Sequence, residues 1–334
     1  MKRAGSLIEK IADIDNLRLA FWKAKRGRSD SPSVVQFQAH WNEQLLVLRK
    51  QLLLGKVAVG KYHYFVIYDP KKRKICAADF GERVLHNALM NICHDVFERV
   101  QIYDSYASRQ GKGTYAALKR AQVFTKKYRW FLKLDVRKYF ESIPHIILKQ
   151  QLSRLFKDKK LLSIFGQIID SYTSIDCATG LPIGNLTSQY FANHYLAAAD
   201  HYAQEQLGCL GYVRYMDDMV LWHNDKEKLL QIGRLFDHFV EDKLGLALKP
   251  FCLHNCQQGL PFLGYILYPD KTLLCARSRI RFIKNLKTYE DKLQKGEWTQ
   301  GDYQRHILPL LAFTEWADAR GFRKKIIEKY TKQG

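Results

Sequence analysis

The sequence Tyr215-Met216-Asp217-Asp218 decides the fold, because it places two adjacent carboxylates between two apolar runs. Residues 210–214 precede it and residues 219–222 follow it, and both flanks are rich in the aromatic and branched side chains typical of strands. The pattern predicts a β-hairpin with the aspartates at its tip. Carboxylates this close repel each other unless a cation lies between them, and oxygen ligands on a rigid turn suit Mg²⁺. The alternative is a metal-free turn, because Asp favours turns in any case.

A further acidic residue ends the short apolar stretch Phe131-Leu132-Lys133-Leu134-Asp135. If this stretch is a strand beside the hairpin, Asp135 joins Asp217 and Asp218 at one edge of a sheet. Three carboxylates can hold two Mg²⁺ ions about 4 Å apart, which is the spacing used for in-line displacement at phosphorus. The alternative is that Asp135 merely ends a strand.

Further stretches follow in an order that resembles the reverse transcriptase family, over roughly residues 60 to 270. The hairpin is similar to the family's active-site box, and residues 134–140 are similar to its first aspartate motif. The other similar stretches are a fingers strand from Arg73 to Arg83, a finger-palm motif from Ser108 to Thr114, the loop and helix under the nucleotide from Gly180 to Gln189, the last palm motif from Leu246 to Lys249, and the primer grip from Phe262 to Tyr265.

The resemblance implies an α+β fold of the right-hand polymerase kind, with an antiparallel sheet in fingers and palm and a helical thumb. It implies an RNA-directed DNA polymerase that extends a primer with two Mg²⁺ ions, for which Mn²⁺ can substitute. The implied partners are a template RNA, a primer or growing cDNA, and deoxynucleoside triphosphates. Two alternatives are a group II intron-type or retron-type reverse transcriptase and a non-catalytic RNA-binding scaffold.

The resemblance also implies which residues hold the metal ions, namely Asp135, Val136, Asp217 and Asp218. A lysine placed like Lys249 lies near the pyrophosphate in the family and can donate a proton as it leaves, which is a general-acid role. The alternative is that Lys249, which follows a Leu-x-Leu pattern and precedes a proline, is an ordinary surface lysine.

Another set of positions is expected around the incoming nucleotide: Arg73, Lys74, Val136, Phe140, Ile183 and Gly184. Arg73, with Lys74 or Lys72 beside it, is the candidate clamp for the triphosphate on a basic hairpin. The ring of Phe140 is expected to exclude a sugar 2′-hydroxyl, because an apolar wall offers it neither room nor a hydrogen bond. The alternatives are a solvated charged turn for the hairpin and an ordinary core ring for Phe140.

Contacts with nucleic acid are expected in a glycine-rich basic loop, in the primer grip and in the basic helical segment near the C-terminus. Glycine permits close approach of a nucleic-acid backbone, and Arg and Lys supply positive charge. The positions expected to make these contacts are Arg109, Lys112, Gly264, Tyr265, Arg277 and Arg281.

The box from Ile183 to Gln189 indicates a subgroup. Retroviral and group II intron enzymes usually carry Gln at the position of Ile183 and Ser-Pro in place of Ser188-Gln189. The box is similar to that of diversity-generating retroelements of bacteria and phages, whose enzymes copy a template-repeat RNA with errors at adenines. A Gln amide can form a hydrogen bond with the sugar of the incoming nucleotide, whereas the Ile183 side chain can only make apolar contacts. The enzyme is therefore expected to discriminate less strictly between correct and incorrect base pairs. The subgroup also implies a partner, the accessory variability determinant, a basic helical pentamer.

The composition agrees with a polyanion binder, since 54 Lys and Arg residues against 33 Asp and Glu give a net charge of +21. An acidic membrane surface or an acidic protein is the alternative partner, although no basic amphipathic helix stands out. Seven cysteines, an odd number, argue against a disulfide framework. With no signal peptide and no apolar run of about 18 residues, we expect a cytoplasmic protein of a bacterial or phage-infected host.

The chain is expected to divide into a helical extension at residues 1–57, reverse transcriptase fingers and palm at 58–270, and a basic helical thumb at 271–334. Strands are predicted at 62–68 and 73–76, and helices at 84–98 and 114–127. In the thumb, Ile280, Ile283 and Leu286 are expected to form one apolar stripe.

Overall fold

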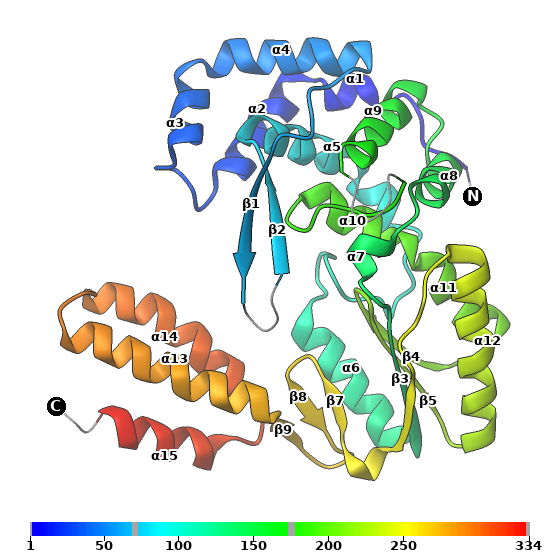
Figure 1. The fold of residues 1–334 in the computed structure, drawn as a ribbon, viewed down its shortest axis with the longest axis vertical. Helices are drawn as coiled ribbons and strands as arrows, with labels where there is room; N and C mark the ends of the chain where they lie inside the picture. Colours follow the sequence, from blue (N-terminus) through cyan, green and yellow to red (C-terminus); the bar gives the residue numbers. More distant parts are fainter. Residues whose placement is uncertain (1, 69–72, 173–177, 332–334) are drawn as a thin grey trace.

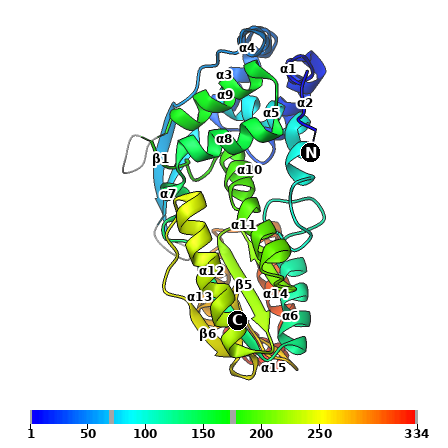
Figure 2. The same ribbon diagram turned by 90° about the vertical axis from the view of Figure 1, so that its right-hand side faces the viewer.

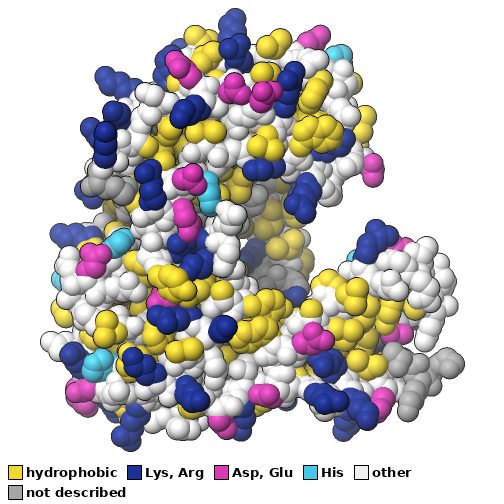
Figure 3. Space-filling view, turned by 180° about the vertical axis from the view of Figure 1, so that it is seen from behind, with side chains coloured by type: hydrophobic (Ala, Val, Ile, Leu, Met, Phe, Trp, Pro, Cys, Tyr) yellow, Lys and Arg dark blue, Asp and Glu magenta, His cyan; other side chains and the backbone are white. Residues whose placement is uncertain are grey.

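The computed structural model describes residues 2–68, 73–172 and 178–331. The chain forms a helical upper part, a middle part with a sheet and a set of projecting C-terminal helices (Figure 1). A space-filling view from behind shows an open hollow between the C-terminal helices and the upper part (Figure 3). The predicted combination of helices with antiparallel sheets is confirmed. None of the helices in these ranges is long and apolar enough to cross a membrane.

The upper part consists of helices that share one apolar core. Asp13 caps the second helix, where its carboxylate accepts hydrogen bonds from two backbone N–H groups. Gly55 ends the fourth helix with φ 70°, and three leucines of that helix are buried at helical spacing. These helices are α1 (Ile8–Ile11), α2 (Ile14–Lys25), α3 (Pro32–Ala39), α4 (Trp41–Leu54), α5 (Phe80–Glu98), α8 (His145–Leu155), α9 (Lys159–Asp170) and α10 (Leu186–Tyr195).

A two-stranded antiparallel ribbon descends from the upper part toward the hollow (Figure 1). Its strands are β1 (Tyr62–Ile67) and β2 (Arg73–Ala78). Lys72, and the turn predicted with it, lie outside the described residues. The predicted strand at 73–76 is confirmed. The stretch that resembles the fingers strand is extended only to Ala78, and the helix predicted from residue 84 begins earlier, at Phe80, from which its buried side chains recur at helical spacing.

The middle part contains a four-stranded antiparallel sheet with the strand order β4-β5-β3-β6. Strand β3 pairs with β5 in a register that puts Asp135 directly opposite Asp218, so the predicted pairing is confirmed. The strands are β3 (Trp130–Asp135), β4 (Gly211–Tyr215), β5 (Asp218–His223) and β6 (Cys252–Asn255).

Helices cover both faces of this sheet, with α12 (Lys226–Leu244) on one side and α6 (Thr114–Lys127) on the other (Figure 2). Successive side chains of a strand point to opposite faces. Leu132 and Leu134 therefore join the core that contains α12, whereas Phe131 joins the core that contains α6. The helices between β3 and β4 also include α7 (Tyr139–Ser142) and α11 (Ala197–His201), which continues into a π-helical turn at Tyr202–Gln206.

The C-terminal part begins with a small sheet and continues as three helices. The sheet has the order β7-β8-β9, with β7 (Leu260–Phe262), β8 (Tyr265–Leu267) and β9 (Thr272–Leu274), and a short 3₁₀ turn at Cys256–Gln258 precedes it. The helices are α13 (Ala276–Gln294), α14 (Gln300–Glu315) and α15 (Arg320–Thr331).

The apolar stripe predicted for this part is wrong in one member. Phe282 and Leu286 are buried in the small core of the C-terminal helices, but Ile280 is 66% exposed. Six residues correspond to roughly 240° of rotation around an α-helix, so Ile280 and Leu286 cannot share a face. A four-residue spacing does put Phe282 and Leu286 on one face.

Candidate active site

The two aspartates of the hairpin lie where predicted, at the tip of β4 and β5. Tyr215 pairs with Asp218, so Met216 and Asp217 form a two-residue turn. Met216 adopts φ 56°, the left-handed conformation that non-glycine residues rarely take. The turn is therefore tight and projects Asp217 from the end of the sheet, next to the carboxylates of Asp218 and Asp135.

Lys249 reaches this edge from the segment that follows α12. Its backbone N–H donates to the Asp135 carbonyl at 2.9 Å, and its ammonium lies 2.6 Å from Asp135 Oδ2. The same segment forms a single β-bridge between Leu248 and Val136. The side chain of Val136 is buried, so this residue can offer a metal ion or nucleotide only its backbone.

Lys133 is a site residue that the sequence analysis missed. Its ammonium lies 3.1 Å from Asp218 Oδ2 and 2.8 Å from the Pro261 carbonyl oxygen of β7. The signal was present, because Lys133 precedes Asp135 by two residues and a strand places such residues on the same face. Lys133 thus links β7 to the end of the sheet that carries Asp135, Asp217 and Asp218, which we call the catalytic edge.

Burial and mutual repulsion raise the pKa of both hairpin carboxylates. For Asp217, burial is the main cause and the neighbouring Asp135 adds to it, whereas Arg73 and Lys249 oppose the rise. For Asp218, burial raises the pKa to about 6 although Lys133 opposes the rise. Both groups consequently favour a positive partner at this edge.

The donor set fits a hard divalent cation. All three side chains are carboxylates, and Oδ1 of Asp218 is buried without a hydrogen-bond partner. As the side chains stand, the described part of the chain contains no group of three His, Cys, Asp or Glu residues close enough to hold a metal ion. The ammonium groups of Lys249 and Lys133 instead contact Asp135 and Asp218. Cation binding at this edge therefore requires these lysines to move off the carboxylates.

Four of the candidates for nucleotide binding come from two segments that lie side by side, namely β2 and the loop that contains Ile183 and Gly184. Arg73 and Lys74 begin β2, and the ammonium of Lys74 lies 4.2 Å from the centre of the Tyr64 ring. The carbonyl of Ile183 accepts a hydrogen bond at 2.8 Å from the backbone of Cys76 in the same strand. Gly184 has φ 125°, and a Cβ there would lie 3.0 Å from the Cys76 carbonyl oxygen. Glycine therefore allows the loop to pack against the ribbon.

The neighbouring rings of Tyr139 and Phe140 differ in burial. Tyr139 is a core ring, with its hydroxyl bonded to the Ala192 carbonyl. Phe140 is half-buried and packs edge-on against Tyr139, at 5.7 Å between ring centres. The carbonyl of Phe140 accepts a bond from Leu181, which fixes it beside the Ile183 loop.

The expected template contact of Arg109 needs correction. Its guanidinium forms an ion pair with Glu98 at 2.6 Å and donates to the carbonyls of Ile102 and Ser105. The side chain is only 8% exposed and holds the loop to the preceding segment, so its charge is not offered to a phosphate. Lys112 lies 3.5 Å from the centre of the exposed Tyr103 ring, where a cation and an aromatic face are both accessible.

The primer-grip prediction needs a similar correction for Tyr265. This side chain is fully buried, and its hydroxyl donates to the Phe313 carbonyl at 2.6 Å, so it fastens β8 to α14 and does not face a nucleic acid. Gly264 lies in the turn between β7 and β8 with φ 91° and accepts a bond from Ser278 at 2.7 Å. Only the backbone of this turn remains a candidate for contact with a primer.

Arg277 and Arg281 lie on the exposed side of α13. Arg281 borders a cavity of about 270 Å³ that Tyr115 of α6 and Phe313 of α14 also line. This cavity opens where the C-terminal helices meet the middle part.

Comparison with known proteins agrees with this geometry. Residues 69–295 match the family model described as reverse transcriptase (RNA-dependent DNA polymerase). The putative COX1/OXI3 intron 1 protein of Saccharomyces cerevisiae is 21% identical over 213 residues, covering 60% of this chain and 26% of that protein. The group II intron-encoded protein LtrA of Lactococcus lactis is 23% identical over 137 residues, covering 40% and 23%. The chain thus spans about a quarter of the length of these relatives.

The fold itself is similar to that of telomerase. The structure of telomerase from Candida albicans in complex with a fragment of telomeric RNA matches 82% of this chain and 55% of that chain, with a TM-score of 0.51 and 14% sequence identity. The predicted polymerase fold is therefore confirmed. Since the family model covers more than half of its residues, including the whole catalytic edge, the chain belongs to the reverse transcriptase family and is homologous to group II intron-encoded members of it.

Proposed function

We propose that this chain is an RNA-directed DNA polymerase that adds deoxynucleotides to a primer 3′ end. The observation that carries the proposal is the register of β3 against β5, which puts Asp135 opposite Asp218 with Asp217 at the adjacent turn. Three carboxylates from two distant segments meet at the end of a sheet that faces the hollow. Such an edge is suited to phosphoryl transfer, because catalysis of this reaction depends mainly on positioning the reactants and on neutralising the negative charge of the transition state.

Asp135, Asp217 and Asp218, with the backbone carbonyl of Val136, would hold Mg²⁺ or Mn²⁺. When bound, two such ions lower the pKa of a primer hydroxyl and neutralise the leaving pyrophosphate. Lys249, whose ammonium contacts Asp135 in this structure, would be released from that carboxylate by the ions and would be the candidate to donate a proton to the leaving pyrophosphate. Arg73 and Lys74 supply positive charge on the ribbon that faces the same hollow.

The remaining nucleotide contacts act through shape. The Ile183 and Gly184 loop packs against β2, and the half-buried Phe140 packs against Tyr139. In the proposed site, Phe140 would close the sugar side and the loop would lie beneath the base pair. Within this proposal, residues 1–57 support the fingers, residues 58–270 form fingers and palm, and residues 271–334 act as a thumb that lays Arg277 and Arg281 along the duplex.

We further propose that the enzyme belongs to a diversity-generating retroelement and makes cDNA with errors at template adenines. The support is the box from Ile183 to Gln189, which has an isoleucine where group II intron enzymes usually carry glutamine. Such an enzyme would copy a template-repeat RNA, work with an accessory variability determinant and act in the cytoplasm of a bacterial or phage-infected host. The second candidate is a group II intron-type enzyme, which the homology to LtrA favours.

Primer extension on an RNA template with Mg²⁺ tests the activity. The wild type should extend the primer, whereas Asp217→Asn should abolish incorporation and leave RNA binding unchanged. A chain that binds RNA but shows no incorporation in either form would contradict the polymerase proposal and favour an RNA-binding scaffold.

Sequencing of the cDNA separates the two subgroups. A diversity-generating enzyme should misincorporate mainly opposite template adenines, and Ile183→Gln should reduce those errors. An even distribution of errors over the four template bases would favour the intron-type alternative.

A further inference from the structure

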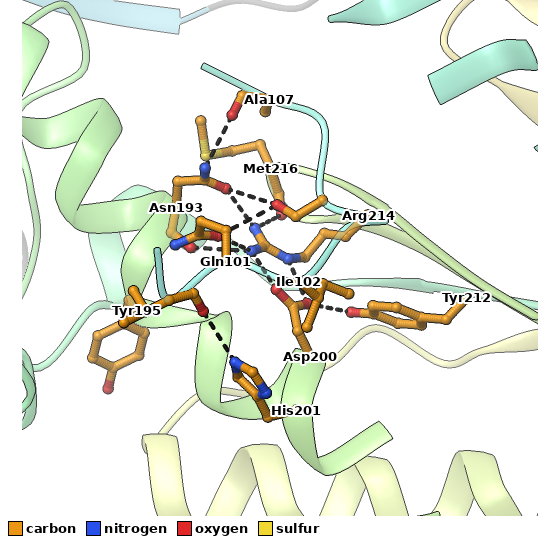
Figure 4. Close-up of polar contacts among 12 residues, drawn as sticks. Gln101, Ile102, Ala107, Asn193, Tyr195, Asp200, His201, Tyr212, Arg214 and Met216 are labelled. Atoms are coloured by element: carbon orange, nitrogen blue, oxygen red, sulfur yellow. Dashed lines mark hydrogen bonds and ion pairs between the residues drawn. The ribbon is translucent and has the colours of Figure 1, made fainter. Parts of the chain in front are cut away.

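Arg214, which lies in β4 two residues before Met216 of the active-site hairpin turn, is completely buried. A buried charge is costly unless it is paired and hydrogen-bonded. Asp200 of α11, equally buried, binds the guanidinium through both carboxylate oxygens, at 2.6 Å from Nε and 2.5 Å from Nη2. Tyr212 donates its hydroxyl to the same carboxylate at 2.7 Å (Figure 4). The ion pair with Asp200 explains how the buried charge is tolerated, but it occupies only two of the five N–H donors of the guanidinium.

The other donors of Arg214 point to the turn and to α10. Nη1 donates to the carbonyl oxygen of Met216 at 3.0 Å and to Oδ1 of Asn193 at 2.8 Å. Nη2 donates to the carbonyl of Asn193 at 3.1 Å and lies 3.3 Å from Oε1 of Gln101 (Figure 4). With the two bonds to Asp200, each of the five N–H donors of a guanidinium has an acceptor.

The bond to Met216 bears directly on the catalytic turn. Met216 has φ 56°, an unfavourable conformation that surrounding contacts must maintain. Its carbonyl belongs to the planar peptide that also carries the N–H of Asp217, so fixing the carbonyl fixes the direction of that N–H. The contacts therefore run from Arg214 through the Met216 carbonyl to the backbone N–H of Asp217.

The same guanidinium connects this turn to the helix of the nucleotide site. Asn193 lies in α10, whose N-terminus follows directly after the Ile183 and Gly184 loop. Asn193 also donates to the Ala107 carbonyl at 3.0 Å, so it is held from a second side. Arg214 thus ties three segments to one planar group, and a guanidinium is suited to this because its donors form a rigid fork.

We propose that Arg214 is a positioning residue, which holds the Met216–Asp217 peptide so that Asp217 faces Asp135 and keeps this turn fixed relative to α10. The inference rests on the proposed polymerase function. The competing explanation is that Arg214 and Asp200 only stabilise the fold as a buried ion pair. The two explanations differ in what the bond to Met216 does.

Arg214→Lys tests the proposal, because lysine keeps the charge for Asp200 but cannot reach Asp200, Asn193 and Met216 together. The matched control is Tyr212→Phe, which removes a bond to Asp200 in the same buried cluster and leaves the contact with Met216 intact. Both variants should lower the melting temperature. Only Arg214→Lys should lower kcat for nucleotide addition, on the order of 10²-fold as expected for a misplaced catalytic group, with KM for the nucleotide nearly unchanged.

Titration with Mn²⁺ alone, followed by electron paramagnetic resonance, gives a readout that does not depend on activity. Arg214→Lys should bind Mn²⁺ more weakly, by about the factor seen for Asp217→Asn, whereas Tyr212→Phe should bind it like the wild type. If Arg214→Lys does not fold, Asp200→Asn, which loosens the same fork, should show the same two effects.

Equal Mn²⁺ affinity in folded Arg214→Lys and wild type, or equal losses in Arg214→Lys and Tyr212→Phe, would overturn the proposal in favour of a purely structural ion pair. A wild type that incorporates no nucleotide would instead defeat the proposed function, and the Mn²⁺ comparison would still decide the role of Arg214.

Discussion

Two lysines neutralise the carboxylates of the catalytic edge, and the sequence pointed to only one of them. Lys249 was predicted from its place in a motif, although its ion pair with Asp135 was not. Lys133 was not predicted, because the apolar pattern of β3 identifies the residues that face the core and says nothing about the partner of a polar residue between them. For Arg109 and Tyr265, a contact was predicted that the structure does not support. Their residue types suggested contacts with nucleic acid, but each side chain is bound to another part of the protein, Arg109 to Glu98 and Tyr265 to Phe313. Sequence spacing indicates the face of a strand, not the long-range partner of a side chain.

Lys133→Met should move the acid limb of the activity profile to higher pH. The ammonium opposes the rise in the pKa of Asp218, so its removal should raise that pKa further. Methionine keeps the length of the apolar stem. The measurement is kcat/KM against pH, with Lys226→Met as the control, since Lys226 contacts Trp130 at the other end of β3. An unshifted acid limb would show that Lys133 does not act on Asp218.

The raised pKa of Asp218 also predicts how stability depends on pH. Between about pH 4 and pH 6 the folded chain holds a proton on Asp218 that the unfolded chain has lost, so this group makes the free energy of unfolding fall as pH rises. The effect is complete above the folded pKa. Chemical denaturation of the metal-free protein across this range measures it. Asp218→Asn should show a weaker fall than the wild type, and identical slopes would contradict the assignment.

At the scale of elements, strands β1 to β5, the hairpin and most helices were predictable, because local periodicity and turn residues determine them, whereas the short strands β6 to β9 were not predicted. The start of α5 was placed too late, although Asp79, a residue type common at helix N-caps, directly precedes Phe80. The contact of the Ile183 and Gly184 loop with β2 joins segments about a hundred residues apart, which no local pattern reveals.

Gly184→Ala should disturb the nucleotide site through this contact. A Cβ there would meet the Cys76 carbonyl oxygen at 3.0 Å on a backbone with φ 125°. Gly208→Ala is the control, because Gly208 has φ 62° and no atom within 4 Å of the added Cβ. Both changes should cost about 1 kcal/mol of stability from the positive φ. Only Gly184→Ala should also raise KM for the nucleotide, and equal KM values in the two variants would refute the packing role.

At the scale of the whole molecule, the charge of +21 and the open hollow together favour a long polyanion as the ligand. The net charge could be read from the composition. The hollow and the direction in which α13 projects were not predictable, because both depend on how β9 joins the C-terminal helices to the middle part. These helices have a small core of their own, and Phe313 and Phe322 also pack against the core that contains α6.

Arg277→Ala should weaken binding of an RNA–DNA duplex equally for all sequences. Loss of one phosphate contact should reduce the slope of log K against log salt concentration by about 1. Lys295→Ala is the control, since Lys295 lies at the far end of α13 and is paired with Asp291 at 2.9 Å. A fluorescence titration at several salt concentrations gives the slopes. Equal slopes for Arg277→Ala and the wild type would place Arg277 outside the duplex contact.

The central claim is that acids from two separate segments bind the same divalent ions. A double-mutant cycle on Mn²⁺ affinity, with Asp135→Asn, Asp217→Asn and the double variant, measures this most directly. Each single change should weaken Mn²⁺ binding strongly, and the double variant should lose much less than the sum of the two losses. Asp135→Asn with wild-type affinity, or strictly additive losses, would contradict it.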